Sequence, residues 1–149
     1  MTFERRIFIK GAASAAFVLV SGVPLRADNH NGWQDWRDQL LAGREVSDGT
    51  IMLDLPAVAE NGAQVPLTVR IDSPMTAGDH VTAIHIIAPR NPAPQIGTFR
   101  LTPQMTRASA MTRIRIAEEQ EILVLAELSD GRVFQQTASI IVSVGGCAT

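Results

Sequence analysis

Residues 64–71, with the sequence Gln-Val-Pro-Leu-Thr-Val-Arg-Ile, alternate between side chains suited to the surface and side chains suited to a core. Alternation with a period of two is typical of a β-strand that buries one face and exposes the other. We therefore predict a half-buried strand here. Its inward side chains would be Val65, Leu67, Val69 and Ile71.

Similar short runs fill the rest of the chain from Thr50 onward, with turn-forming residues such as Asp130-Gly131 between them. About seven short strands at this spacing predict an all-β fold, an immunoglobulin-like antiparallel β-sandwich. The sequence has one cysteine, so no disulfide can join the sheets and packing alone must hold the core. The other strands are expected at residues 51–53, 80–88, 96–101, 112–117, 122–128 and 133–144.

A different period precedes the strands. Large apolar residues recur there at positions i, i+3, i+7 and i+8, which predicts a short amphipathic N-terminal helix. Asn31 is expected to cap this helix and Gly43 to end it. We expect the tryptophans to pack against the core or an interface, with a stacking platform for a ligand as the alternative. The apolar residues are Trp33, Trp36, Leu40 and Leu41.

Residues 122–126 are apolar at consecutive positions, so both faces of this strand avoid water. Such a strand either lies in the centre of a covered sheet or faces a partner. The sequence leaves both possibilities open. Under the second, Leu123 and Leu125 are the candidate residues of a partner interface.

The first 27 residues resemble an export signal. Arg5-Arg6 with Phe8 and Lys10 matches a twin-arginine pattern, and a weakly apolar stretch follows at residues 11–23. This stretch is too short to span a bilayer comfortably, so we expect cleavage near Ala27 and a mature form without a membrane anchor. An ordinary secretory signal and a retained anchor are the alternatives. The expected location is the periplasm, reached by the twin-arginine route.

Removal of residues 1–27 changes the charge of the protein. The mature chain keeps nine arginines against fourteen acidic side chains, a net charge of −5, and it contains no lysine. An acidic chain without a basic patch argues against nucleic acid or an anionic membrane as a partner. The twin-arginine route exports folded proteins, and we find no cofactor motif. A partner protein exported together with this chain is therefore expected.

Residues 28–144 are expected to form the sandwich domain, and residues 145–149 a flexible C-terminal arm. The arm carries the only cysteine, Cys147, directly after Gly145 and Gly146, which leave the backbone free to adopt many conformations. No histidine, lysine or arginine lies within ten residues of Cys147 to activate it. This pattern indicates a carrier thiol that depends on other proteins for its chemistry.

Two other chemistries remain possible from the residues alone. A thiol enzyme would bring Cys147 against His80 or His85, because catalytic groups assemble from distant segments. A metal site is disfavoured, because His30, His80 and His85 are scattered along the chain. The acidic residues 118–121 are expected to be a solvated strand edge.

Several motifs in order resemble the SoxY family, the sulfur-carrying subunit of the bacterial Sox thiosulfate-oxidising system. The family ends in Gly-Gly-Cys-Gly-Gly, and this chain supplies Gly145, Gly146 and Cys147 before Ala148 and Thr149 replace the last two glycines. The other motifs are 59–62 with Val65-Pro66, 72–76, 91–94, 112–117 with Gln120, and 129–131.

The resemblance implies a cofactor-free sandwich subunit that forms a heterodimer with a second small sandwich subunit, SoxZ. In the family, a c-type haem enzyme conjugates thiosulfate to the tail cysteine, a manganese-dependent hydrolase releases sulfate, and a sulfane dehydrogenase oxidises the remaining sulfur. The implied role of Cys147 is to hold these intermediates covalently, and the chain itself would not be an enzyme. A non-catalytic periplasmic binding or assembly module of immunoglobulin type is the alternative function.

Overall fold

The computed structural model describes residues 32–47 and 50–143. The predicted signal peptide, the expected cap at Asn31, His30 and the arm at 145–149 lie outside these residues. The described elements are α1 (Trp33–Leu41), β1 (Val46–Ser47), β2 (Ile51–Asp54), β3 (Val58–Ala59), the 3-10 helix η1 (Gly62–Gln64), β4 (Val65–Ile71), β5 (Val81–Ile87), β6 (Gln95–Arg100), β7 (Ala108–Ile114), β8 (Gln120–Leu128) and β9 (Val133–Val142).

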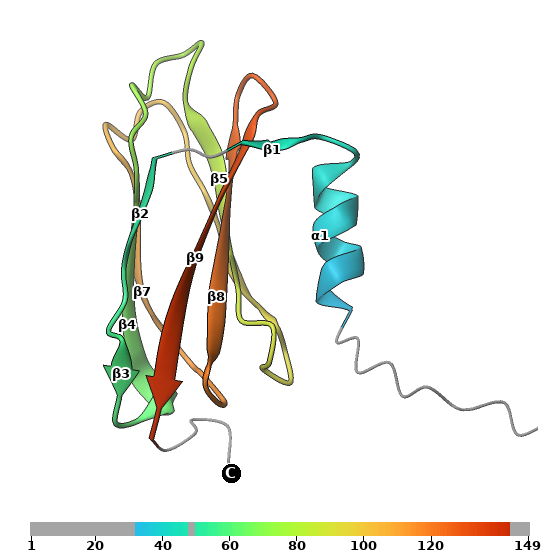
Figure 1. Cartoon of the computed structure of the whole chain (residues 1–149). Helices are drawn as coiled ribbons and strands as arrows, with labels where there is room; N and C mark the ends of the chain where they lie inside the picture. Colours follow the sequence, from blue (N-terminus) through green and yellow to red (C-terminus); the bar gives the residue numbers. More distant parts are fainter. Residues whose placement is uncertain (1–31, 48–49, 144–149) are drawn as a thin grey trace, which may run out of the picture.

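Two sheets pack face to face, and the predicted β-sandwich is confirmed (Figure 1). The small sheet has the order β2-β4-β7, and both of its pairings are antiparallel. The large sheet has the order β1-β9-β8-β5-β6, and β3 also pairs with β9. β4 buries every second residue, as its alternation predicts.

Aliphatic side chains from the facing sides of the two sheets form the main core. Its centre is completely closed to solvent, because residues from β4, β5 and β8 interdigitate there. Burial of this kind supplies most of the driving force for folding and needs no disulfide. Residues of this core that are 0% exposed include Leu67, Val69, Ile84, Ile122, Val124 and Ile140.

The sheet differs from the sequence prediction in three places. β1 and β3 each pair with β9 in parallel, so the sandwich is not purely antiparallel. Each has two residues, too few for an alternation to be recognised. β7 begins earlier than the predicted strand at 112–117, because its first inward positions are the small residues Ala108 and Ala110. Alanine contributes little to a hydrophobic alternation, so the sequence pattern does not show where this strand begins.

Helix α1 spans Trp33–Leu41. Its N-cap is Gly32 at φ 66° and not the expected Asn31, there is no side-chain cap, and Trp36 N–H donates to Gly32 O at 3.1 Å. The predicted end at Gly43 is confirmed, since Ala42 (φ 47°) and Gly43 (φ 79°) adopt left-handed backbone conformations there. No helix within 32–47 and 50–143 is long and apolar enough to cross a membrane.

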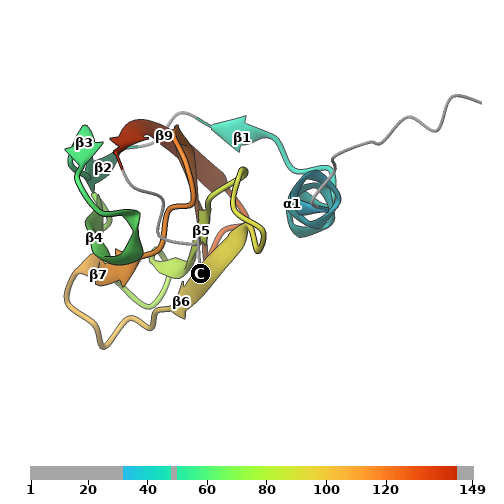
Figure 2. The ribbon, with the colours of Figure 1, turned by 90° about the horizontal axis from the view of Figure 1, so that it is seen from below.

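One interpretation of the sequence placed Leu123 and Leu125 on a surface exposed to a partner. The structure instead buries both side chains. β8 is a central strand, and α1 covers its outer face on the side away from the small sheet (Figure 2). Leu125 is 0% and Leu123 6% exposed, packed with Trp33 and Trp36. The tryptophan stripe therefore provides from within the chain the cover that the prediction assigned to a partner.

Candidate functional site

The predicted carrier arm continues from the end of β9. β9 ends at Val142, and Cys147 with Gly145 and Gly146 lies outside the described residues. Cys147 is the fifth residue after Val142, so its Cα lies at most about 17 Å from the end of the strand. This limit defines which described residues the thiol can reach.

His80 lies at the opposite end of the sandwich. It precedes β5, and its backbone exchanges hydrogen bonds with Ser129, which follows β8 (Ser129 N–H to His80 O at 2.8 Å, His80 N–H to Ser129 Oγ at 3.1 Å). β9 starts from this end and runs for ten residues, about 30 Å. The thiol on one chain therefore cannot reach His80 on the same chain.

His85 is buried beneath α1, where both ring nitrogens already have partners. Nε2 lies 2.8 Å from Glu127 Oε1, and Nδ1 lies 2.9 Å from Thr98 Oγ1. Because a carboxylate only accepts, Nε2 carries a proton. The ring also meets Trp36 edge to face at a centroid distance of 5.5 Å. With 5% exposure, His85 is a structural residue and a poor base for an external thiol.

Glu127 links this histidine to the end of the helix. Its Oε2 accepts from Arg44 Nη2 at 2.7 Å, and the same guanidinium donates to the carbonyls of Leu40 and Leu41 in the last turn of α1. Burial raises the pKa of Glu127, but the hydrogen bonds and charges of Arg44 and His85 outweigh it and hold the pKa below its ordinary value of 4.5. We call Arg44, Glu127 and His85 the helix clamp.

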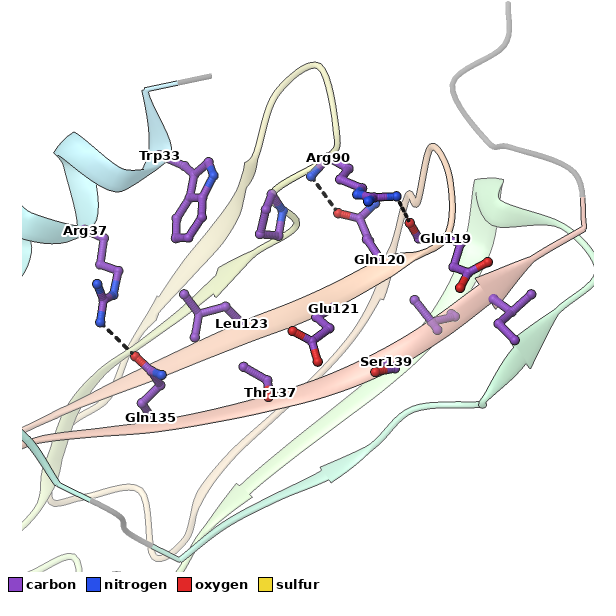
Figure 3. Close-up of a pocket in the computed structure, with 13 residues that line it drawn as sticks. Trp33, Arg37, Arg90, Glu119, Gln120, Glu121, Leu123, Gln135, Thr137 and Ser139 are labelled. Atoms are coloured by element: carbon purple, nitrogen blue, oxygen red, sulfur yellow. Dashed lines mark hydrogen bonds between the residues drawn. The ribbon is translucent and has the colours of Figure 1, made fainter. Parts of the chain in front are cut away.

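A groove of about 530 Å³ lies between α1 and the outer face of β8 and β9 (Figure 3). Its floor is formed by two cross-strand pairs, Glu121 with Ser139 and Leu123 with Thr137. The other lining residues come from α1, from the segment after β5, and from both ends of the floor. They are Trp33, Arg37, Pro89, Arg90, Glu119, Gln120, Gln135, Ile140 and Ile141.

The two arginines that border the groove already have hydrogen-bond partners within the chain. Arg37 Nη2 donates to Gln135 Oε1 at 3.2 Å, and Arg90 Nη1 donates to Glu119 O at 3.1 Å (Figure 3). Glu121 is exposed on the floor between them. The floor is therefore mixed, with one exposed carboxylate beside apolar and hydroxyl side chains, and engaged arginines border it. This composition suits contact with a protein surface better than capture of a small anion.

Within residues 32–47 and 50–143, no group of three or more His, Cys, Asp or Glu side chains could hold a metal ion. The acidic residues Glu118, Glu119 and Glu121 are exposed before and at the start of β8, so their predicted solvation is confirmed. The prediction of an edge is wrong, because β8 lies between β9 and β5. Gly131 has φ 90° in the turn between β8 and β9, which confirms the turn predicted at Asp130-Gly131.

The helix clamp was missed by sequence reasoning. Arg44 and Glu127 are 83 residues apart, and only the fold brings them together. One signal was available: His85 and Glu127 are polar residues within strands whose other residues are almost all apolar. A polar residue on a doubly buried strand needs a partner, and these two partner each other.

Comparisons with solved structures support the fold. The sulfur carrier protein SoxY from Chlorobium limicola f thiosulfatophilum is 26% identical, with a TM-score of 0.62, and the match covers 75% of this chain and 96% of that chain. A superoxide reductase (neelaredoxin) from Ignicoccus hospitalis is 13% identical, with a TM-score of 0.56 and coverage of 62% and 80%. The second likeness concerns the fold alone. A search of curated proteins found no match.

The family model for the sulfur oxidation protein SoxY matches residues 37–147. The match begins within α1, spans every strand of the sandwich and extends to Cys147. The sequence motifs, the architecture and the similarity to the Chlorobium structure all indicate the same family. This chain belongs to the SoxY family of sulfur carriers.

Proposed function

We propose that this protein is a periplasmic carrier that holds thiosulfate-derived intermediates covalently on Cys147 and presents them to the enzymes of sulfur oxidation. The observation that carries the proposal is the family match, which runs through the domain and includes Cys147. A sulfur-carrier role in sulfur oxidation follows from the family. The covalent attachment at Cys147 and the periplasmic location are our extension of it.

The positions and contacts of the two described histidines favour a carrier over a thiol enzyme. His80 is out of reach of the tethered thiol, and both ring nitrogens of His85 are engaged. No described histidine can therefore act as a base for Cys147 within one chain. A thiol that other proteins must activate has to reach their active sites. Cys147 is the fifth residue after β9, which is far enough along the chain to permit this.

The proposed cycle begins with oxidative conjugation. The thiol sulfur of Cys147 bonds to the sulfane sulfur of thiosulfate, which is the sulfur that carries no oxygen. One proton is released, and two electrons pass to the haem groups of a c-type conjugating enzyme. Water then cleaves the bond to the terminal sulfonate in a manganese-dependent hydrolase. This step releases sulfate and leaves a persulfide on Cys147, which a sulfane dehydrogenase oxidises further. Every intermediate stays on the same side chain.

The proposed complex is a heterodimer with a SoxZ-like sandwich subunit. The family implies such a partner. Leu123 and Leu125 lie beneath α1, so we expect the heterodimer to use other residues. Export through the twin-arginine signal at residues 1–27 would bring the folded pair to the periplasm together.

The direct test replaces Cys147 by serine in the heterodimer. Thiosulfate-dependent oxygen uptake in a reconstituted system should be abolished, while the melting temperature and binding to the SoxZ-like subunit should remain unchanged. Retained oxygen uptake would rule out the carrier role. A large loss of stability would show instead that the cysteine is structural.

A second test concerns the geometry of the arm. Replacing Gly145 and Gly146 by valine keeps the thiol and its distance along the chain but stiffens and widens the segment before it. If the arm must enter an enzyme pocket, turnover should fall while a maleimide labels Cys147 at a near-normal rate. The converse variant, Ala148→Gly with Thr149→Gly, should hold or raise turnover. Equal turnover for the wild type and the valine variant would show that the arm does not thread a narrow channel.

A further inference from the structure

The short segment between Val142 and Cys147 limits where an enzyme can bind to this protein, provided that the proposed carrier role of Cys147 holds. At most about 17 Å of chain separates Val142 from the Cα of Cys147. Part of that length must lie inside the active site that receives the sulfur. The surface of any such enzyme must therefore come close to the end of β9, whichever reaction it catalyses.

Two exposed apolar side chains stand together at this end of the sheet. Val58 on β3 is 57% exposed and Ile141 on β9 is 49% exposed, and the two are opposite each other in the parallel pairing of these strands. Backbone hydrogen bonds on either side hold β3 in place, from Ile141 N–H to Ala57 O at 2.9 Å and from Ser143 N–H to Ala59 O at 3.0 Å.

This pair is not needed for the core of the sandwich. The neighbouring residues Ala59 and Ile140 point inward and are buried, so Val58 and Ile141 necessarily point outward. Ile141 also lines the groove, where the adjacent cross-strand pair on the floor is Ser139 with Glu121. An apolar patch beside polar and charged residues is the usual composition of a protein-binding surface.

We propose that Val58 and Ile141, with the adjoining end of the groove, form the docking surface for the enzymes that act on Cys147. We call these residues the arm-root surface. The matching partner is an enzyme with an apolar rim around the entrance to its active site. Because all these enzymes must approach the same short tether, they would bind this surface one at a time.

The test varies the arm-root surface in the heterodimer and keeps Cys147 intact. Val58→Asp with Ile141→Asp places two carboxylates where an apolar contact is expected. The matched control is Met52→Asp with Met111→Asp on the outer face of the small sheet, where the side chains are 55% and 78% exposed. Both variants change the charge equally. The probe is the c-type thiosulfate-conjugating enzyme, with the heterodimer as the varied substrate and the adduct measured by mass.

We expect kcat/KM for conjugation to fall at least about tenfold in the arm-root variant, as for loss of a central interface contact, with kcat much less affected. The control variant should stay within about twofold of the wild type, as expected for residues outside an interface. Labelling of Cys147 by maleimide should be the same in all three proteins, and the heterodimer should stay intact on gel filtration. If the carboxylates lower the melting temperature, Val58→Thr with Ile141→Thr repeats the measurement with residues that favour strands.

Four results would overturn the inference. Unchanged kcat/KM in the arm-root variant would show that the enzyme docks elsewhere. Faster maleimide labelling would mean that the surface instead covers the arm of the free carrier. Loss of the SoxZ-like subunit, or a change in oligomeric state, would assign the surface to that subunit or to a second copy. Absence of any adduct on the wild type would reject the proposed function itself.

Discussion

The two faces of β8 are covered in different ways, and the outer face carries two glutamates where the inner face is almost entirely apolar. Ile122, Val124 and Ala126 face the small sheet and are all 0% exposed in a mostly aliphatic core. On the other face, Leu123 and Leu125 meet two tryptophans of a single helix, beside the buried His85 and its half-buried partner Glu127. Towards the end of β9 the cover by α1 stops and the groove begins.

This difference separates what holds the fold from what is available for function. The inner face joins two sheets along their whole length, so each residue there has many partners. The outer face depends on one helix of nine residues and on the helix clamp that fixes its C-terminal end. The fold therefore tolerates an open outer face near the root of the arm, where a carrier needs contact with other proteins.

The largest expected effect breaks the inner face. Ile122→Ala removes part of a completely buried side chain and should lower the free energy of unfolding by about 3–4 kcal/mol. Leu123→Ala, its neighbour on the outer face, should cost about 1–2 kcal/mol, because a single helix covers it and the groove adjoins it. Urea denaturation of the two variants makes the comparison. Equal losses would show that α1 closes the outer face as tightly as the second sheet closes the inner one.

An intermediate effect is expected for the helix clamp. Glu127→Gln places an amide NH₂ against the donors of Arg44 or His85 and should cost about 1–3 kcal/mol at pH 7. Glu121→Gln, an exposed residue of the same strand, is the matched control and should change stability by less than about 0.5 kcal/mol.

The cost of Glu127→Gln should depend on pH. The folded-state pKa of Glu127 lies below the ordinary value of 4.5, so its charge contributes stability above that value, and the contribution is lost as the pH falls through the folded pKa. The wild type and Glu127→Gln should thus converge as the pH falls below 4.5 and through the folded-state pKa, when their free energies of unfolding are measured by urea denaturation. A difference that stays constant across this range would contradict a role for the charge of Glu127.

The smallest expected effect concerns the open part of the outer face. Arg37→Ala removes a hydrogen bond to Gln135 at a partly exposed site and should cost less than about 1 kcal/mol. Arg44→Ala, just beyond the C-terminus of the same helix, removes the ion pair with Glu127 and two bonds to helix carbonyls, and should cost clearly more. Melting temperatures of both variants rank these two contacts between the helix segment and the large sheet. The reverse order would show that the contact at the groove is the stronger one.

The predictable parts of this structure are those set by local periodicity. Alternation identified β4, the stripe of tryptophans and leucines identified α1, and turn residues identified the break at Gly131. The clamp between Arg44 and Glu127 could not be found in this way, because its residues meet only after the chain has folded. The placement of Leu123 failed for a related reason: an apolar strand face indicates that something covers it, but periodicity does not tell a helix of the same chain from a partner. The predicted site residue Cys147 lies outside the described residues, so its role stays a prediction.

The central claim is tested most directly by the mass of the C-terminal peptide, taken from protein purified without reducing agent from cells that oxidise thiosulfate. We predict that the peptide containing Cys147 carries added sulfur, as a thiosulfate conjugate or a persulfide, and that a reductant removes it. Cells that produce Cys147→Ser should yield no such adduct and should fail to consume thiosulfate. An unmodified Cys147 in wild-type cells during active thiosulfate oxidation, or normal consumption by the serine variant, would contradict the account.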